Sequence, residues 1–113
     1  MTIDEYLATA PPFEPPIFEA VMAALEPVGP VHVEPLSVGV FLKRAQTFAQ
    51  LRPLTRWETL SFSLHRREQH PAITRRHLPH GDRWFHVVRL TRPEDLDDRV
   101  VGWLAEAYDD APA

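Results

Sequence analysis

Six histidines and no cysteine are the residues of this sequence that first suggest chemistry. Imidazole nitrogens are common zinc ligands, and they exchange protons near neutral pH. The candidates for a shared site lie in and beside an arginine-rich region: His70, His77, His80 and His86. Their spacings match neither the H-E-x-x-H motif nor a pair one helical turn apart. We therefore assign no metal ligand, and a metal-binding or catalytic histidine cluster is kept as an alternative.

No residue pattern typical of an enzyme accompanies these histidines. The serines lack the G-x-S-x-G context of a nucleophile, and Glu58, Glu68 and Asp82 do not suggest a paired-carboxylate site. The four glycines form no phosphate-binding loop, and without cysteine the chain has no thiolate nucleophile or disulfide framework. We predict no catalytic residue and no cofactor. A non-enzymatic binding or accessory module is the function that we rank first.

The charges are segregated along the chain. Residues 1–42 carry six acids and no Lys or Arg, and residues 43–92 carry eleven of the twelve basic residues against three acids. Residues 93–113 carry seven acids and one arginine, so the three segments contribute −6, +8 and −6 to the net charge of −4. The simplest interpretation is that these segments neutralise one another within one small domain.

The alternative is an exposed basic sheet face that binds an anion, either nucleic acid or an acidic protein. The candidate ligand-binding residues are Lys43, Arg66, Arg67, Arg75, Arg76, His86 and Arg89. Arginine-rich strands can follow phosphates, and aromatic residues lie nearby in the sequence. The pI of about 5.8 is far below that of a dedicated nucleic-acid-binding protein, so a protein partner or a homodimer also stays open.

The residues from 83 to 110 predict the elements around which the rest of the chain is organised. Period-two alternation over residues 84–90 predicts a strand inside the sheet, on which we expect a buried His86 hydrogen-bonded to Asp97 or Asp98. The residues from Thr91 to Glu94 match a capping box, which predicts a helix over 93–109. The expected buried stripe of this helix is Leu96, Val100, Trp103, Leu104, Ala107 and Tyr108.

The rest of the chain predicts two more helices and several short strands. A capping box at Thr2 and Glu5 starts a short helix, which with a proline-rich lead-in occupies residues 1–12, and apolar spacing predicts a second helix over 16–26. Strands are predicted over 31–34, 38–43, 48–51, 59–64 and 73–77. Residues 52–56 are expected to be a connector. The fold class is a single α+β domain over 1–113, with a four- to five-stranded, mainly antiparallel sheet and N-terminal and C-terminal helices packed on one face.

The sequence gives no indication of export or of a membrane. The N-terminus lacks a basic region followed by an apolar core, and no apolar run approaches the length of about 18 residues typical of a membrane span. The absence of cysteine fits a reducing compartment. We therefore expect a cytoplasmic protein.

Five stretches of the chain carry a resemblance to a known family. They are residues 2–7, 48–49, 83–86, 93–98 and 102–108, which together extend over nearly the whole chain. In them the chain resembles the small bacterial domains of the DUF5655 family, a domain of unknown function. The resemblance implies helices packed on an antiparallel sheet and transfers no catalytic residue. The chain departs from the family pattern at Phe85, where relatives often carry a second histidine, and at Ser37 and Val38, where they tend to carry a lysine followed by Thr or Ser.

Overall fold

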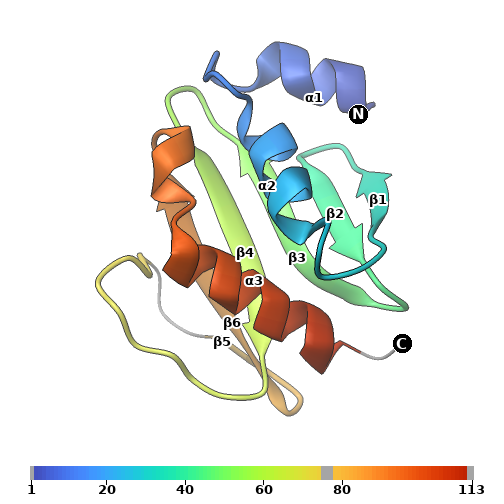
Figure 1. The fold of residues 1–113 in the computed structure, drawn as a ribbon, viewed down its shortest axis with the longest axis vertical. Coiled ribbons are helices and arrows are strands. Elements are labelled where there is room, and N and C mark those ends of the chain that lie inside the picture. Colours follow the sequence, from blue (N-terminus) through green and yellow to red (C-terminus); the bar gives the residue numbers. More distant parts are fainter. Residues whose placement is uncertain (1, 75–77, 112–113) are drawn as a thin grey trace.

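The structure is a computed structural model that describes residues 2–74 and 78–111. Its elements are α1 (Ile3–Thr9), α2 (Ile17–Leu25), β1 (His32–Pro35), β2 (Val40–Lys43), β3 (Thr47–Pro53), β4 (Glu58–Leu64), β5 (Leu78–His80), β6 (Arg83–Leu90), the 3-10 turn η1 (Pro93–Asp95) and α3 (Asp98–Asp110). The strands pair antiparallel in the order β1-β2-β3-β4-β6-β5 (Figure 1). The predicted α+β class is confirmed. The three-residue β5 extends the sheet beyond the four or five strands expected.

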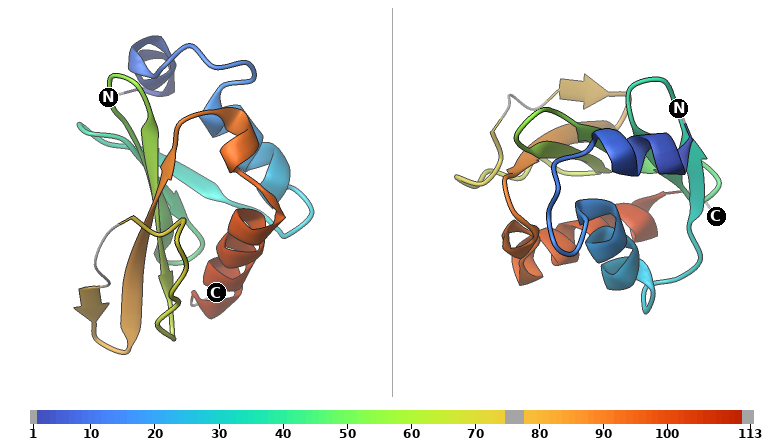
Figure 2. Two further views of the ribbon diagram at one scale, coloured as in Figure 1. Left: turned by 90° about the vertical axis from the view of Figure 1, so that its left-hand side faces the viewer. Right: turned by 90° about the horizontal axis from the view of Figure 1, so that it is seen from above.

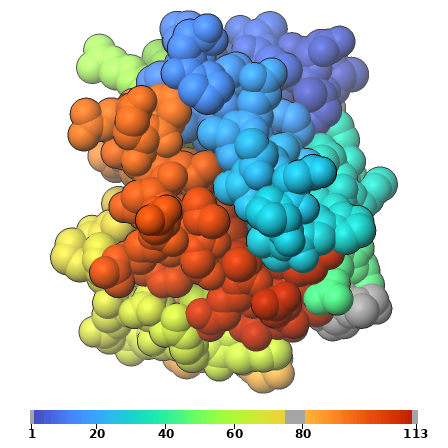
Figure 3. Space-filling view, in the orientation of Figure 1, coloured from blue at the N-terminus to red at the C-terminus, as the bar shows by residue number. Residues whose placement is uncertain are grey.

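The helices form a layer on one face of the sheet. Figure 2 shows α2 and α3 side by side on that face, and Figure 3 shows them covering it. The seven-residue α1 lies across the end of the sheet at which β3 turns into β4 (Figures 1 and 2). The opposite face, which we call the open face, is covered by no helix of the part of the chain that the structure describes.

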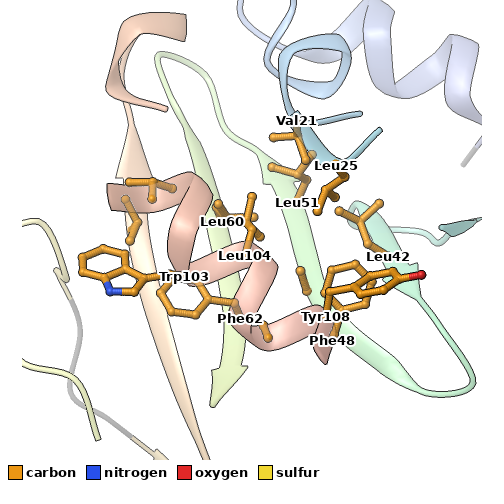
Figure 4. Close-up of a cluster of buried hydrophobic side chains, with 14 of the residues drawn as sticks. Val21, Leu25, Leu42, Phe48, Leu51, Leu60, Phe62, Trp103, Leu104 and Tyr108 are labelled. Atoms are coloured by element: carbon orange, nitrogen blue, oxygen red, sulfur yellow. The ribbon is translucent and has the colours of Figure 1, made fainter. Parts of the chain in front are cut away.

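The core lies between the helices and the inward side chains of the central strands (Figure 4). Phe62 of β4 is at its centre. Its ring stacks on Trp103 of α3 at 5.6 Å between centroids, and on His86 of β6 at 5.3 Å. At the other end of α3, the ring of Tyr108 meets Phe48 of β3 edge-on at 5.4 Å. The predicted apolar stripe of the C-terminal helix is therefore the contact that joins the two layers.

The C-terminal helix begins five residues later than its capping box predicts. Asp97 is the N-cap of α3, and its Oδ1 accepts the N–H of Val100 at 3.0 Å. The hydroxyl of Thr91 instead donates to the carboxylate of Asp95 at 2.7 Å, which closes the short turn η1. Leu96 then leaves the helical region, with ψ at 70°. The chain needs this break because it must pass from the sheet to the helical layer before the buried stripe can face the core.

Most other predicted elements are confirmed with small shifts of their ends. The capping box of α1 is present, since Thr2 Oγ1 accepts the N–H of Glu5 and the Glu5 carboxylate accepts the N–H of Thr2. The edge strand predicted over 73–77 falls partly outside the described residues, which omit 75–77. Ile73 forms an isolated bridge to Val88, and the short strand in this region is β5.

We predict that Trp103→Ala lowers the free energy of unfolding by about 3–5 kcal/mol. Trp103 is 4% exposed, so its removal leaves a cavity over Phe62 that the sheet cannot fill. Equilibrium unfolding in urea measures the loss. Trp84→Ala, at a half-buried position, is the control and should cost less. A loss below about 1 kcal/mol at Trp103 would contradict the packing described above.

We predict that Asp97→Ala lowers the free energy of unfolding by about 1 kcal/mol, because it removes the cap of α3. Asp98→Ala is the matched control. Asp98 lies in the first turn without a capping role, so its loss should cost only a few tenths of a kcal/mol through the helix dipole. Thermal unfolding of the three proteins measures the difference. If Asp97→Ala cost no more than Asp98→Ala, Asp97 would not be the cap of α3.

Candidate functional site

Arg66, one of the predicted ligand-binding residues, is occupied by partners within the fold. It lies in the loop that crosses beside α3, and its Nε and Nη2 each donate to the carboxylate of Glu106 at 2.8 Å. Its Nη1 donates to Glu68 at 2.7 Å, and this hydrogen bond lowers the pKa of the Glu68 carboxyl. Arg66 therefore ties the loop to α3.

The other predicted cations are scattered over the sheet. Lys43 on β2 forms an ion pair with Glu34 at 2.8 Å, and Arg67 lies 5.9 Å from the centre of the Trp84 ring. Arg89 lies on the open face of β6. Arg75 and Arg76 lie outside the described residues. The structure therefore does not gather the described members of the predicted set into one surface.

His86 is fully buried, and it faces the helical layer rather than the open face. Its Nε2 accepts the backbone N–H of Glu68 at 2.9 Å, which holds the crossing loop against β6. We expected Asp97 or Asp98 of the following helix as a partner, and the structure shows Asp97 Oδ1 accepting the N–H of Val100 at the start of α3. His86 therefore joins the loop to the core from a position away from the open face.

Two further arginines bind the C-terminal end of α3. Arg44 Nη1 donates to the carbonyl oxygen of Tyr108 at 3.1 Å, and Arg83 Nη2 donates to the carbonyl oxygen of Asp110. The last carbonyls of a helix carry its negative dipole and have no partner within the helix. Together with Arg66, these residues account for part of the charge segregation by neutralisation within the domain.

Two other arginines lie on the open face near the β3–β4 turn, and a third lies in that turn. The strand register places Arg52 of β3 opposite Thr59 of β4, and Thr59 opposite Arg89 of β6. Arg56 belongs to the turn that joins β3 to β4, at the same end of the sheet. Among residues 2–74 and 78–111, no carboxylate lies within ion-pair distance of any of the three.

Arg89 lines a hollow of about 360 Å³ whose lining also includes Glu94, Asp95 and Asp97. Two other hollows adjoin Arg52 and Arg56. The larger, of about 690 Å³, is lined by Thr9, Pro53, Leu54, Thr55, Arg56 and Trp57. The smaller, of about 220 Å³, is lined by Gln50, Arg52, Leu54, Thr59, Ser61 and Val87. Both hollows are lined by Leu54, and none of the described residues that line them is acidic. We call these two hollows, together with the adjoining Arg89, the basic groove.

The basic groove has the chemistry of a site for an anion. The guanidinium of Arg89 lies 4.4 Å from the centre of the Trp57 ring, so the indole holds it in a defined orientation. Guanidinium groups form paired hydrogen bonds with phosphate or carboxylate oxygens. The threonine and serine hydroxyls and the amide of Gln50 add neutral hydrogen-bonding groups, whereas Leu54 and Val87 supply apolar surface.

A buried carboxyl group lies directly behind the larger hollow. Glu58 follows Trp57 in the chain, but its side chain is 0% exposed and points into the core. The hydroxyl of Tyr6 in α1 donates to Glu58 Oε1, and within the described residues Oε2 has no hydrogen-bond partner. Burial raises the pKa of the Glu58 carboxyl above its ordinary value, and the hydrogen bond from Tyr6 offsets only part of this effect. Burial and the same contact also raise the pKa of Tyr6.

Arg52, Arg56 and the Tyr6–Glu58 contact are the features that the sequence analysis missed. Residues 52–56 were predicted to be a connector, which is wrong for Arg52 and Pro53, because β3 continues to Pro53; residues 54–56 lie in the turn that follows. The one available signal was the two-residue step from Gln50 to Arg52, which places both side chains on the same face of a strand. No sequence pattern links Tyr6 to Glu58, because 52 residues separate them.

Among the described side chains, which do not include those of residues 75–80, there is no group of three or more His, Asp or Glu that could hold a metal ion. His77 of the histidine hypothesis lies outside these residues. No described helix is both long and apolar enough to cross a membrane.

Comparison with known proteins places the chain in a family without adding an activity. Neither the curated proteins nor the solved structures contain a match. One family model matches residues 3–111, which is nearly the whole chain and extends from α1 to the end of α3. The family is described as a domain of unknown function. The chain belongs to the DUF5655 family.

Proposed function

We propose that this protein is a non-enzymatic binding module that holds an anionic ligand in the basic groove. The observation that carries the proposal is the cluster of Arg52, Arg56 and Arg89 without a carboxylate partner among the described residues. Neighbouring like charges repel one another, whereas a bound anion would be attracted to all three. Elsewhere the fold gives Arg66 and Lys43 carboxylate partners.

The distribution of charge favours a compact ligand over a long polyanion. The arginines lie on the open face near the β3–β4 turn or in that turn, and the neighbouring row across the strands is neutral, with Gln50, Ser61 and Val87. A phosphate or carboxylate group would bind the arginines, and a neutral polar part of the same molecule would lie over this second row. The larger hollow, at about 690 Å³, has the size usual for small-molecule sites.

Single-stranded nucleic acid is the second candidate. Trp57 lines the larger hollow at the same end of the sheet as the arginines, and an indole ring offers a surface on which a base can stack. A phosphate of the strand would then bind the guanidinium groups beside it. Single-stranded nucleic acid would bind through a base as well as a phosphate, so its binding can be distinguished experimentally from that of a compact anion.

We predict that the protein binds inorganic pyrophosphate and that the double variant Arg52→Ala/Arg56→Ala loses most of this binding. Each arginine should contribute about tenfold or more to the affinity, because a hydrogen bond to a charged group is worth about 1.5–3 kcal/mol. Isothermal titration calorimetry at low and at physiological salt measures the affinity, which should fall as salt screens the charges. Arg99→Ala, an exposed change on α3, is the matched control and should bind like the wild type.

The same titration with a mixed-sequence single-stranded oligonucleotide separates the two candidates. Tighter binding of the oligonucleotide that is lost in Trp57→Ala would favour nucleic acid. If neither probe bound at low salt, the basic groove would have no role as an anion site. Equal losses in the double variant and in Arg99→Ala would also contradict the proposal, because the effect would then follow net charge alone.

A further inference from the structure

The short helix α1 is joined to the sheet by a buried polar contact. It has seven residues, and a segment with four prolines separates it from α2. A helix of this length is not stable alone in water, so its position depends on what it packs against. Tyr6 and Glu58 are both 0% exposed, and their hydrogen bond connects α1 to the first residue of β4.

The groups around Glu58 offer its carboxyl group little compensation for a charge. Pro53 of β3 and Leu90 of β6 are its neighbours across the strands, and neither side chain is polar. The adjacent arginines of those strands, Arg52 and Arg89, belong to the open face. From α1, Tyr6 supplies a hydroxyl.

The remaining charged groups of the neighbouring helices are directed elsewhere. Asp4 of α1 is exposed, and Glu5 is engaged with the backbone of Thr2. From α2, Phe18 contacts the ring of Tyr6 at 5.7 Å between centroids, while Glu19 is exposed. Glu58 is therefore held in the core by one hydrogen bond and by apolar contacts.

The same contact lies behind the basic groove. Thr9, which is three residues beyond Tyr6 at the end of α1, lines the larger hollow, and so does Trp57, the residue before Glu58. One wall of this hollow thus comes from α1 and the other from the β3–β4 turn. If α1 left the sheet, the hollow would lose the wall that contains Thr9.

We propose that α1 is a proton-controlled latch of the basic groove. When the Glu58 carboxyl group is protonated, α1 is docked and the groove is complete. When Glu58 releases its proton to solvent, α1 is released and the groove loses one wall. The control of ligand binding rests on the function proposed above, whereas the movement of α1 itself requires no ligand.

The direction of this control follows from the cost of a buried charge. An ionised carboxylate with one hydrogen bond is disfavoured in an apolar interior, whereas the neutral acid is tolerated there. Burial raises the pKa of Glu58 in the docked state, so the docked state binds the proton more tightly than the undocked state. The stabilisation of docking is therefore complete below the ordinary pKa of a glutamate and is lost as pH rises through the raised value. Tyr6 keeps its own proton throughout, because its pKa is also raised.

Hydrogen exchange of the α1 amides tests the latch directly. Tyr6 N–H donates to the carbonyl of Thr2, and Ala10 N–H to that of Tyr6, both at 2.9 Å, so these amides report docking. After correction for the pH dependence of the chemical exchange rate, their protection should fall as pH rises above the ordinary pKa of a glutamate and through the raised pKa of Glu58. Each unit by which docking raises the pKa of Glu58 corresponds to a tenfold fall.

Two matched variants identify the responsible proton. Glu58→Gln keeps the shape without a titrating group, so protection of α1 should stay at its acid value over the whole pH range. Glu19→Gln makes the same substitution at an exposed site of α2 and should keep the pH dependence of the wild type. Protection that does not change with pH in the wild type, or that changes equally in Glu58→Gln, would overturn the latch.

Sulfate binding at the same pH values separates the latch from the proposed function. Sulfate does not titrate in this range, so its affinity should fall as α1 is released in the wild type and stay constant in Glu58→Gln. If α1 is released but sulfate binds at no pH, the movement stands and the proposed anion site fails. If sulfate binds and α1 protection is constant, the anion site stands and the latch fails. If α1 is released while sulfate affinity is unchanged, α1 does not control the groove.

Discussion

The ring of Trp103 stacks on Phe62 and joins the helical layer to the sheet. It fixes α3 over the central strand β4, and the same ring of Phe62 stacks on His86 of β6. Because side chains alternate along a strand, turning Phe62 toward the helices turns Thr59 and Ser61 toward the open face. The antiparallel register then carries this orientation to the neighbouring strands, so the packing of the core determines which groups line the basic groove.

The position of α3 determines which arginines have partners within the fold. Its acidic side chains and terminal carbonyls lie beside the basic segment, where Arg66 binds Glu106 and Arg83 binds the carbonyl of Asp110. Cations within reach of α3 therefore stabilise the fold. Arg52 and Arg56 lie at the opposite end of the sheet, beside the β3–β4 turn, where none of the described residues supplies such a partner. Their availability for a ligand is a consequence of distance from the acidic helix.

More of the fold than of the candidate site could be predicted from the sequence. The strand at β6 and the buried stripe around Trp103 follow from periodicity, because the period of apolar residues is fixed by backbone geometry. The predicted start of α3 was wrong because the sequence offers two capping signals, at Thr91 and at Asp97, within seven residues. The path of the chain from the sheet to the helical layer selects the second. The role of Arg66 could not be predicted because its partner Glu106 lies 40 residues away in the sequence.

The α+β class, most of the helices and strands, and the segregation of charge into three segments follow from the order of residues along the chain. These properties are local, since they depend on residue type and on spacing within one element. Which arginines are neutralised, and which border the basic groove, depends on the folded arrangement, and folding also brings Tyr6 to Glu58. The physical reason is that pairing partners, burial and the pKa of a carboxyl group depend on neighbours from distant parts of the chain, and strand register and helix packing choose those neighbours.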